Sequence, residues 1–213
     1  MISPDERTND YHFVTRWRVR ATIDQVAQIL GDAPALARWW PSVYLRVNQL
    51  EPGDERGVGK VVDLYTKGWL PYTLRWQFRV TESRYPRGFS LEATGDFEGR
   101  GIWTFEQDGT WADVTYDWKI RAEKPLLRYG SAVVKPIFRA NHLWAMARGE
   151  ESLRLELARR EATSSEELAR VPPPPPPTRV HPFGVMAGGV LALGLLLGLY
   201  RVAVRARAAG RHE

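Results

Sequence analysis

Residues 72–80 read YTLRWQFRV, and residues 113–120 read DVTYDWKI. In both stretches apolar or aromatic residues alternate with polar ones, so one face of an extended chain is apolar and the other is wet. Residues 11–20, YHFVTRWRVR, follow the same pattern and place Trp17 on the apolar face. This period of two predicts strands with one solvated face, which is typical of an antiparallel sheet.

Further strands are expected between these three, because shorter alternating runs are separated by glycine-containing breaks such as Pro52-Gly53 and Asp108-Gly109. They fall near residues 43–50, 58–66, 88–94 and 100–107.

Two helical regions interrupt the strand pattern. Thr22 to Gln25 has the form of a capping box and predicts a short helix that leads toward a Trp-Trp-Pro segment. Residues 136–160 predict one long helix. Its common face holds Ile137, Asn141, Trp144 or Ala145, Arg148 or Gly149, Leu153 and Leu157. A shorter helix is expected just before it, over 125–134. The sequence therefore predicts an α+β domain in which a curved antiparallel sheet of about seven strands packs on the long C-terminal helix.

Short motifs occur in the order of a known superfamily. They are ATIDQVAQIL at 21–30, Trp-Trp-Pro at 39–41, GIWTF at 101–105 and NHLWAM at 141–146. Together with the order of elements over residues 10–160, they make the chain resemble the START-like superfamily, also called SRPBCC proteins, which has the helix-grip fold. It includes polyketide cyclase/dehydrase and lipid-transport-like proteins.

The resemblance implies a deep apolar cavity between the sheet and the long helix, in which relatives hold lipids, sterols or polyketides. Burial of apolar ligand surface drives such binding, and a few polar groups orient the ligand. The inward-facing residues expected to line the cavity are Trp17, Leu64, Leu74, Trp76, Phe78, Trp103, Tyr116, Trp118, Asn141, His142 and Trp144.

Catalytic motifs are sparse. The domain has two histidines, and the strand pattern places His12 on the wet face, while His142 lies on the long helix beside Trp144. We find no nucleophile elbow, phosphate loop, dinucleotide fingerprint or clustered metal ligands, so no cofactor and no metal are expected. The carboxylates that could form an acid pair lie on strand faces or turns, and these are Glu92, Asp96, Glu98, Asp113 and Asp117. The strand alternation also places Arg75 on the outer face of the sheet.

Composition excludes several classes of protein. The absence of cysteine removes disulfides, thiol nucleophiles and thiolate metal sites. The formal charge is +5, but residues 1–178 are nearly neutral, whereas residues 179–213 carry five arginines and one acid. A nucleic-acid-binding domain should itself carry a basic face. We therefore expect no nucleic-acid partner.

The C-terminal part has a different composition. Six consecutive prolines occupy 172–177, and an 18-residue run without charge covers 183–200. At ~1.5 Å per residue this run approaches the thickness of a hydrocarbon core. The chain is therefore divided into a flexible N-terminus (1–9), the domain (10–160), a proline-rich linker (161–182), a transmembrane helix (183–204) and a basic tail (205–213).

The anchor has two open features. Small residues four apart favour close approach of two membrane helices, and these are Gly184, Gly188, Gly194 and Gly198. The arginine-rich tail favours a cytoplasmic end by the positive-inside rule, but the N-terminus shows no signal-peptide pattern that would export the domain. We favour a cytoplasmic domain held by a C-terminal span.

Three functions follow as hypotheses. The first is a membrane-anchored protein that binds a hydrophobic, lipid-like or polyketide-like small molecule. The second is a cyclase/dehydrase-like enzyme that uses polar cavity groups to orient a polyketide. The third is a non-catalytic assembly module that acts through the proline run and the membrane helix.

Overall fold

The computed structural model describes residues 10–122 and 134–178. Seven strands and several helices make up this part of the chain. In order they are β1 (Asp10–Arg20), α1 (Ile23–Gly31), η1 (Ala33–Ala35), α2 (Leu36–Trp39), β2 (Tyr44–Glu51), β3 (Val61–Lys67), β4 (Thr73–Ser83), β5 (Gly88–Gly95), β6 (Phe97–Asp108), β7 (Trp111–Ala122), α4 (Val134–Glu161) and α5 (Ser165–Arg170).

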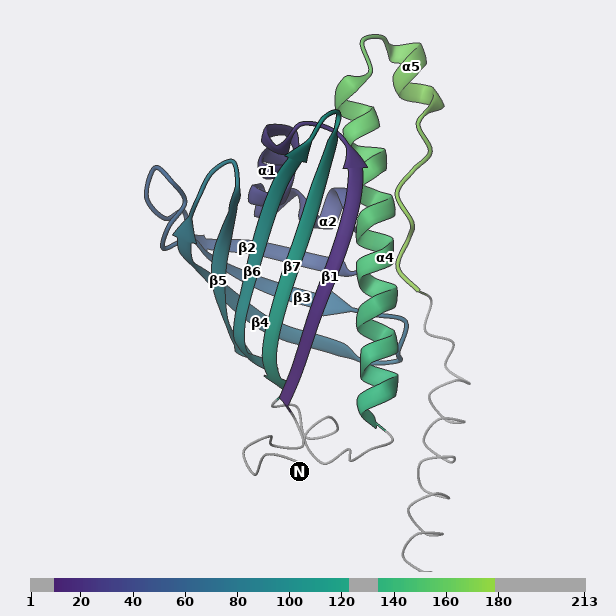
Figure 1. Ribbon diagram of the computed structural model, residues 1–213. Helices are drawn as coiled ribbons and strands as arrows, with labels where there is room; N and C mark the ends of the chain where they lie inside the picture. Colours follow the sequence, from purple (N-terminus) through teal and green to yellow (C-terminus); the bar gives the residue numbers. More distant parts are fainter. Residues whose placement is uncertain (1–9, 123–133, 179–213) are drawn as a thin grey trace, which may run out of the picture. The chain divides into compact units, whose positions relative to one another are not determined.

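All seven strands form one antiparallel sheet in the order β1-β7-β6-β5-β4-β3-β2. The sheet curves strongly, with α1 and α2 at one end and α4 running along it (Figure 1). The alternation read from the sequence is confirmed, because Tyr11, Phe13, Trp17 and Val19 are buried while Arg18 between them is exposed. The predicted helix-grip arrangement of the sheet and the long C-terminal helix is therefore confirmed.

Helix α1 begins as the capping box predicts. The Thr22 hydroxyl accepts a hydrogen bond from the Gln25 amide at 3.2 Å, and the Gln25 side chain accepts one from the Thr22 amide at 2.8 Å. Its apolar face, with Val26 and Ile29, is buried. The chain then turns through η1 and α2, which buries Trp39 and Trp40.

Helix α4 contacts the core through one stripe. The buried residues of this stripe are Phe138, Asn141, Met146, Gly149, Ser152, Leu153, Glu156 and Leu157. The prediction that Ile137 lies on this face is wrong, because its side chain is 42% exposed. Trp144 is only half-buried. The prediction is confirmed for Asn141, Leu153 and Leu157, which are buried, and half of the stripe is small or polar.

Gly149 sets how closely α4 approaches the rest of the domain. A Cβ atom at this position would lie 2.2 Å from Cζ2 of the Trp40 ring. Glycine is therefore required wherever Trp40 fills this space, and the ring and the helix backbone pack directly against each other.

The first strand, β1, lies at one edge of the sheet, and α4 covers part of that edge. The Arg18 amide donates to Glu150 Oε1 at 3.3 Å, and Arg154 donates to the Arg18 carbonyl at 3.1 Å. Glu150 and Arg154 also form an ion pair at 2.6 Å. These bonds occupy backbone groups that an edge strand otherwise presents to other chains.

Near the C-terminal end of α4, a buried carboxylate joins it to α2. Glu156 is 2% exposed and accepts two bonds from Arg38, at 2.8 and 2.9 Å, and one from Arg160 at 3.0 Å. Burial by itself would raise the pKa of Glu156, but the hydrogen bonds from Arg38 and Arg160 outweigh it, so the pKa lies below its usual value.

The segment predicted as a linker is partly structured. Ser164 caps α5 by accepting from the Glu167 amide at 3.2 Å, and the Arg159 guanidinium donates to the carbonyl of Pro172. The proline run belongs to the same compact unit as the sheet, and this unit ends at Pro177.

Across residues 10–122 and 134–178, no helix has the length and apolarity needed to span a membrane. The predicted span 183–204, the tail 205–213, the N-terminus 1–9 and most of the helix expected over 125–134 lie outside the described residues.

We predict that Glu156→Gln lowers the free energy of unfolding by about 2 kcal/mol at neutral pH, because it removes charge-assisted hydrogen bonds. Because the native pKa is lowered, this contribution is present above the unfolded pKa and disappears as pH falls through the native pKa. Urea titrations across pH should therefore show the two proteins converging in acid.

The matched control is Glu151→Gln, which removes a half-exposed partner of Arg148 from the same helix. We expect a change within about 0.5 kcal/mol. Equal losses for the two variants would contradict the structural role given to Glu156.

Candidate functional site

A cavity of about 100 Å³ lies between the curved sheet and the N-terminal half of α4. Most of its lining is apolar or aromatic, with a few polar side chains. The lining residues are Trp40, Val43, Tyr44, Thr66, Lys67, Gly68, Leu74, Trp76, Phe97, Tyr116, Trp118, Phe138, Asn141, His142, Ala145 and Met146.

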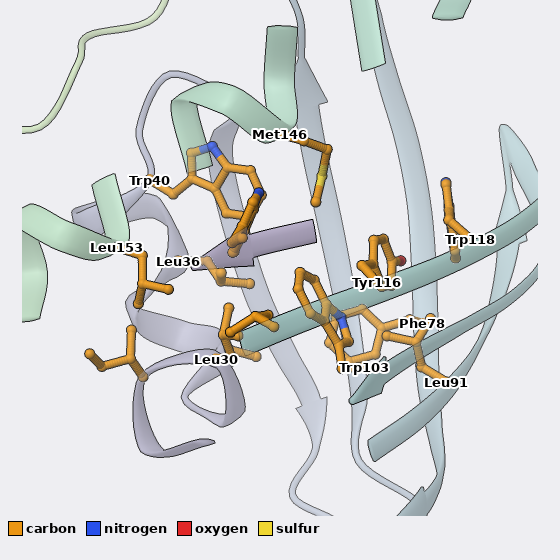
Figure 2. Close-up of a cluster of buried hydrophobic side chains, with 14 of the residues drawn as sticks. Leu30, Leu36, Trp40, Phe78, Leu91, Trp103, Tyr116, Trp118, Met146 and Leu153 are labelled. Atoms are coloured by element: carbon orange, nitrogen blue, oxygen red, sulfur yellow. The ribbon is translucent and has the colours of Figure 1, made fainter. Parts of the chain in front are cut away.

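One wall of the cavity is formed by Tyr116 and Trp118 of β7, and their stack of rings continues behind the wall to Trp103 of β6. Tyr116 stacks on Trp103 with centroids 4.1 Å apart and on Trp118 at 5.4 Å. Room for this stack comes from Gly101, where a Cβ atom would lie 2.6 Å from the Tyr116 hydroxyl. Figure 2 shows Trp103, Tyr116 and Trp118 beside one another, with Met146 of α4 facing them.

Polar groups enter the cavity from α4 and from the end of β3. Asn141 accepts a hydrogen bond from the Leu70 amide at 3.2 Å, which ties the β3–β4 loop to the helix. His142 stacks on Phe13 at 4.1 Å, and its Nε2 lies 3.4 Å from the Thr15 hydroxyl. These contacts hold the imidazole against β1.

Burial shifts the pKa values of the ionisable groups in the cavity in the direction that favours their neutral forms. Burial raises the pKa of Tyr44 and Tyr116, and the proximity of Tyr44 adds to the shift of Tyr116. Burial lowers the pKa of His142 to about 4 and also lowers that of Lys67. At neutral pH the cavity therefore offers phenols as donors and an uncharged imidazole as donor or acceptor.

The structure brings some of the sequence-predicted residues together around this cavity and separates others. Leu74, Trp76, Tyr116, Trp118, Asn141 and His142 line it. Trp17, Leu64 and Trp103 are buried in the surrounding core, Phe78 lines a different hollow, and half-buried Trp144 lies under the Arg148 guanidinium.

Several lining residues were missed from the sequence. Trp40 stood out as part of Trp-Trp-Pro, but nothing in that motif indicated where its ring would lie. The sequence did not identify Phe97, Phe138 and Met146 as lining residues, because their position at the cavity depends on how β6 and α4 pack in three dimensions. Lys67 ends β3 and is 5% exposed, whereas alternation predicts a wet side chain there.

The weaker catalytic candidates lie on the outer surface. His12 contacts Asp117 at 3.0 Å, with both side chains exposed. Asp113 pairs with Arg18, Glu98 pairs with Arg121, and Glu92 is exposed. Asp96 accepts from the Arg75 amide at 2.9 Å, and Arg75 itself is exposed. None of these carboxylates reaches the cavity.

Comparison with protein families matches residues 11–157 to the sequence model described as polyketide cyclase / dehydrase and lipid transport. A comparison with curated proteins finds no match.

Solved structures share the fold at low sequence identity. The Zhui aromatase/cyclase from Streptomyces sp. R1128 aligns with a TM-score of 0.58 and 18% identity over 73% of this chain and 98% of its own. A protein of Thermus thermophilus gives 0.55 and 14% over 71% and 100%, and protein Ms6760 from Mycobacterium smegmatis gives 0.50 and 16% over 72% and 94%.

We predict that the His142 imidazole titrates with a midpoint near 4, against 6.5 for an ordinary histidine. The unfolded chain then binds more protons than the native protein between these values. Stability is therefore complete above pH 6.5 and falls as pH drops toward 4, by about 3 kcal/mol in total.

His142→Gln should make stability nearly independent of pH between 6.5 and 4, because glutamine does not titrate there. Its side chain fills roughly the volume of the imidazole. NMR titration of the imidazole and urea unfolding at several pH values measure the two effects. A His142 midpoint above about 6 would contradict the assignment of a desolvated, neutral ring.

Proposed function

The chain belongs to the polyketide cyclase / dehydrase and lipid transport family, and on this premise we propose that its domain binds a hydrophobic, lipid-like or polyketide-like small molecule between the sheet and α4. The observation that carries the proposal is the cavity lining. It combines an aromatic wall with a few polar side chains, among them Tyr116, Asn141, His142 and Lys67, which is the composition of sites that bind apolar ligands with a polar end.

The size of the cavity sets a condition on binding. About 100 Å³ holds only a few water molecules, whereas small-molecule sites usually enclose about 300–1,000 Å³. Ligand entry therefore requires side chains to move. Met146 lines the cavity and is suited to this because its unbranched side chain adopts many shapes.

A polar end of the ligand would meet several partners. Tyr116 and His142 line the cavity, so a phenol and an uncharged imidazole are available to it. A carbonyl or hydroxyl oxygen of the ligand would accept a hydrogen bond from the Tyr116 phenol.

We predict that Ala145→Leu, which enlarges a side chain at the cavity wall, weakens ligand binding roughly tenfold through overpacking. Ala147→Leu, on the exposed side of the same helix, is the matched control. Native mass spectrometry of the full-length protein, followed by extraction and identification of bound compounds, measures occupancy. Equal occupancy in the two variants would sink the proposal.

A second candidate function is a cyclase/dehydrase-like reaction. It is favoured by the neutral His142 imidazole and the Tyr116 phenol on one cavity, since an imidazole can take a proton and a phenol can supply one. A compound recovered unchanged after incubation supports binding, and a compound recovered with a new ring or double bond supports catalysis.

The proposal includes attachment to a membrane through residues 183–204, with the domain in the cytoplasm. The attachment rests on the 18-residue uncharged run. The arginines that follow it favour a cytoplasmic tail instead, so the cytoplasmic placement of the domain needs a separate test. Such a span would keep the domain close to a pool of lipid-like ligands.

We predict that the double variant Leu193→Arg/Leu196→Arg moves the protein from the membrane fraction to the soluble fraction, because each charge costs about 3 kcal/mol near the centre of a span. The corresponding double isoleucine variant is the control. Protease should digest the domain only after cells are opened. Release of the isoleucine control into the soluble fraction would count against anchoring. Digestion of the domain in intact cells would count against the cytoplasmic placement.

A further inference from the structure

A second hollow, larger than the central cavity, lies at the α1 end of the domain. It encloses about 440 Å³ and shares no lining residue with the cavity under α4. Its walls are α1, the β2–β3 loop and the turn between β4 and β5. This volume falls within the range of small-molecule sites.

The floor of this hollow is apolar. Leu30, Phe78, Val80 and Phe105 are all buried yet contribute to its lining, and Phe89 packs edge-on to Phe105 with centroids 6.3 Å apart. Apolar surface of this kind binds rings or short chains by removing them from water.

The rim is a preorganised loop. Asp54 Oδ1 accepts from the Arg56 amide at 2.9 Å and from the Val58 amide at 2.8 Å, and the Gly57 amide donates to the Asp54 carbonyl. Because the Asp54 carboxylate already occupies these amides, the loop backbone has no free nest for an external phosphate. Recognition of a charged ligand therefore depends on the side chains of the rim.

Lys60 is the rim cation best placed for this role. Its half-buried side chain reaches across to α1, where Nζ donates to the Gly31 carbonyl at 3.0 Å. The ammonium has two further donors, and it forms no ion pair within residues 10–122 and 134–178. The rim acids Asp32, Asp54 and Glu55 are exposed, so water screens them more strongly than it screens Lys60.

We infer that this hollow is a second ligand site, which takes a small amphipathic carboxylate. The apolar body lies on Phe78, Phe89 and Phe105, and the carboxylate accepts hydrogen bonds from the Lys60 ammonium. The inference does not depend on a ligand in the central cavity.

Three probes with one apolar body test the site and its charge preference: 4-phenylbutyrate, 4-phenylbutanol and 4-phenylbutylamine. Calorimetric titration of the full-length protein should show tightest binding of the carboxylate. Lys60→Gln keeps a donor for the Gly31 carbonyl but removes the charge, and it should weaken carboxylate binding about tenfold while leaving the alcohol unchanged.

The location is tested separately. Ser83→Trp places a large ring at the mouth of the hollow and should abolish binding of both carboxylate and alcohol, whereas Ala145→Leu in the central cavity should leave both unchanged. Lys119→Gln on exposed β7 controls for net charge. No binding of any probe, carboxylate binding that survives Ser83→Trp, or a preference for the amine would overturn the inference.

Discussion

The contact between Trp40 and Gly149 is the constraint on which the rest of the domain depends. The indole ring occupies the volume that any side chain at 149 would need, so α4 lies directly on the short helical segment before β2. This seating places Asn141 and His142 over the sheet in one direction and brings Glu156 to Arg38 in the other. Helix α4 thus covers the cavity with its N-terminal half and is fixed to Arg38 through Glu156 near its C-terminal end.

Aromatic side chains both build the core and limit the space inside it. Trp17 packs on Trp40 and Trp103 at 5.7 and 5.4 Å, and Trp103 in turn stacks on Tyr116. Large rings bury much area in few side chains, which stabilises a strongly curved sheet. The same filling leaves only about 100 Å³ beneath α4, whereas about 440 Å³ stays open at the α1 end.

Much of the domain follows from local sequence. The alternation in 72–80 and 113–120 identifies β4 and β7, because side chains of an extended chain alternate between two faces. The capping box of α1 is present as Thr22 and Gln25 predict. The short motifs and their order also identify the superfamily, and the family match over 11–157 agrees with that resemblance.

The sequence by itself therefore determined the seven strands, α1, the long helix α4, their order and the family, since each depends on periodicity or on neighbours in the chain. Only the tertiary structure decided which inward-facing residues border empty space. Trp103 and Tyr116 face each other across β6 and β7 with the same alternation, yet Tyr116 lines the cavity and Trp103 fills the core around it. That distinction depends on sheet curvature and on the volume taken by Trp40, neither of which leaves a periodic signal in the sequence. The buried stripe of α4 was likewise set by fit to Trp40 and Arg38, which accounts for glycine at position 149 and for a buried glutamate at position 156.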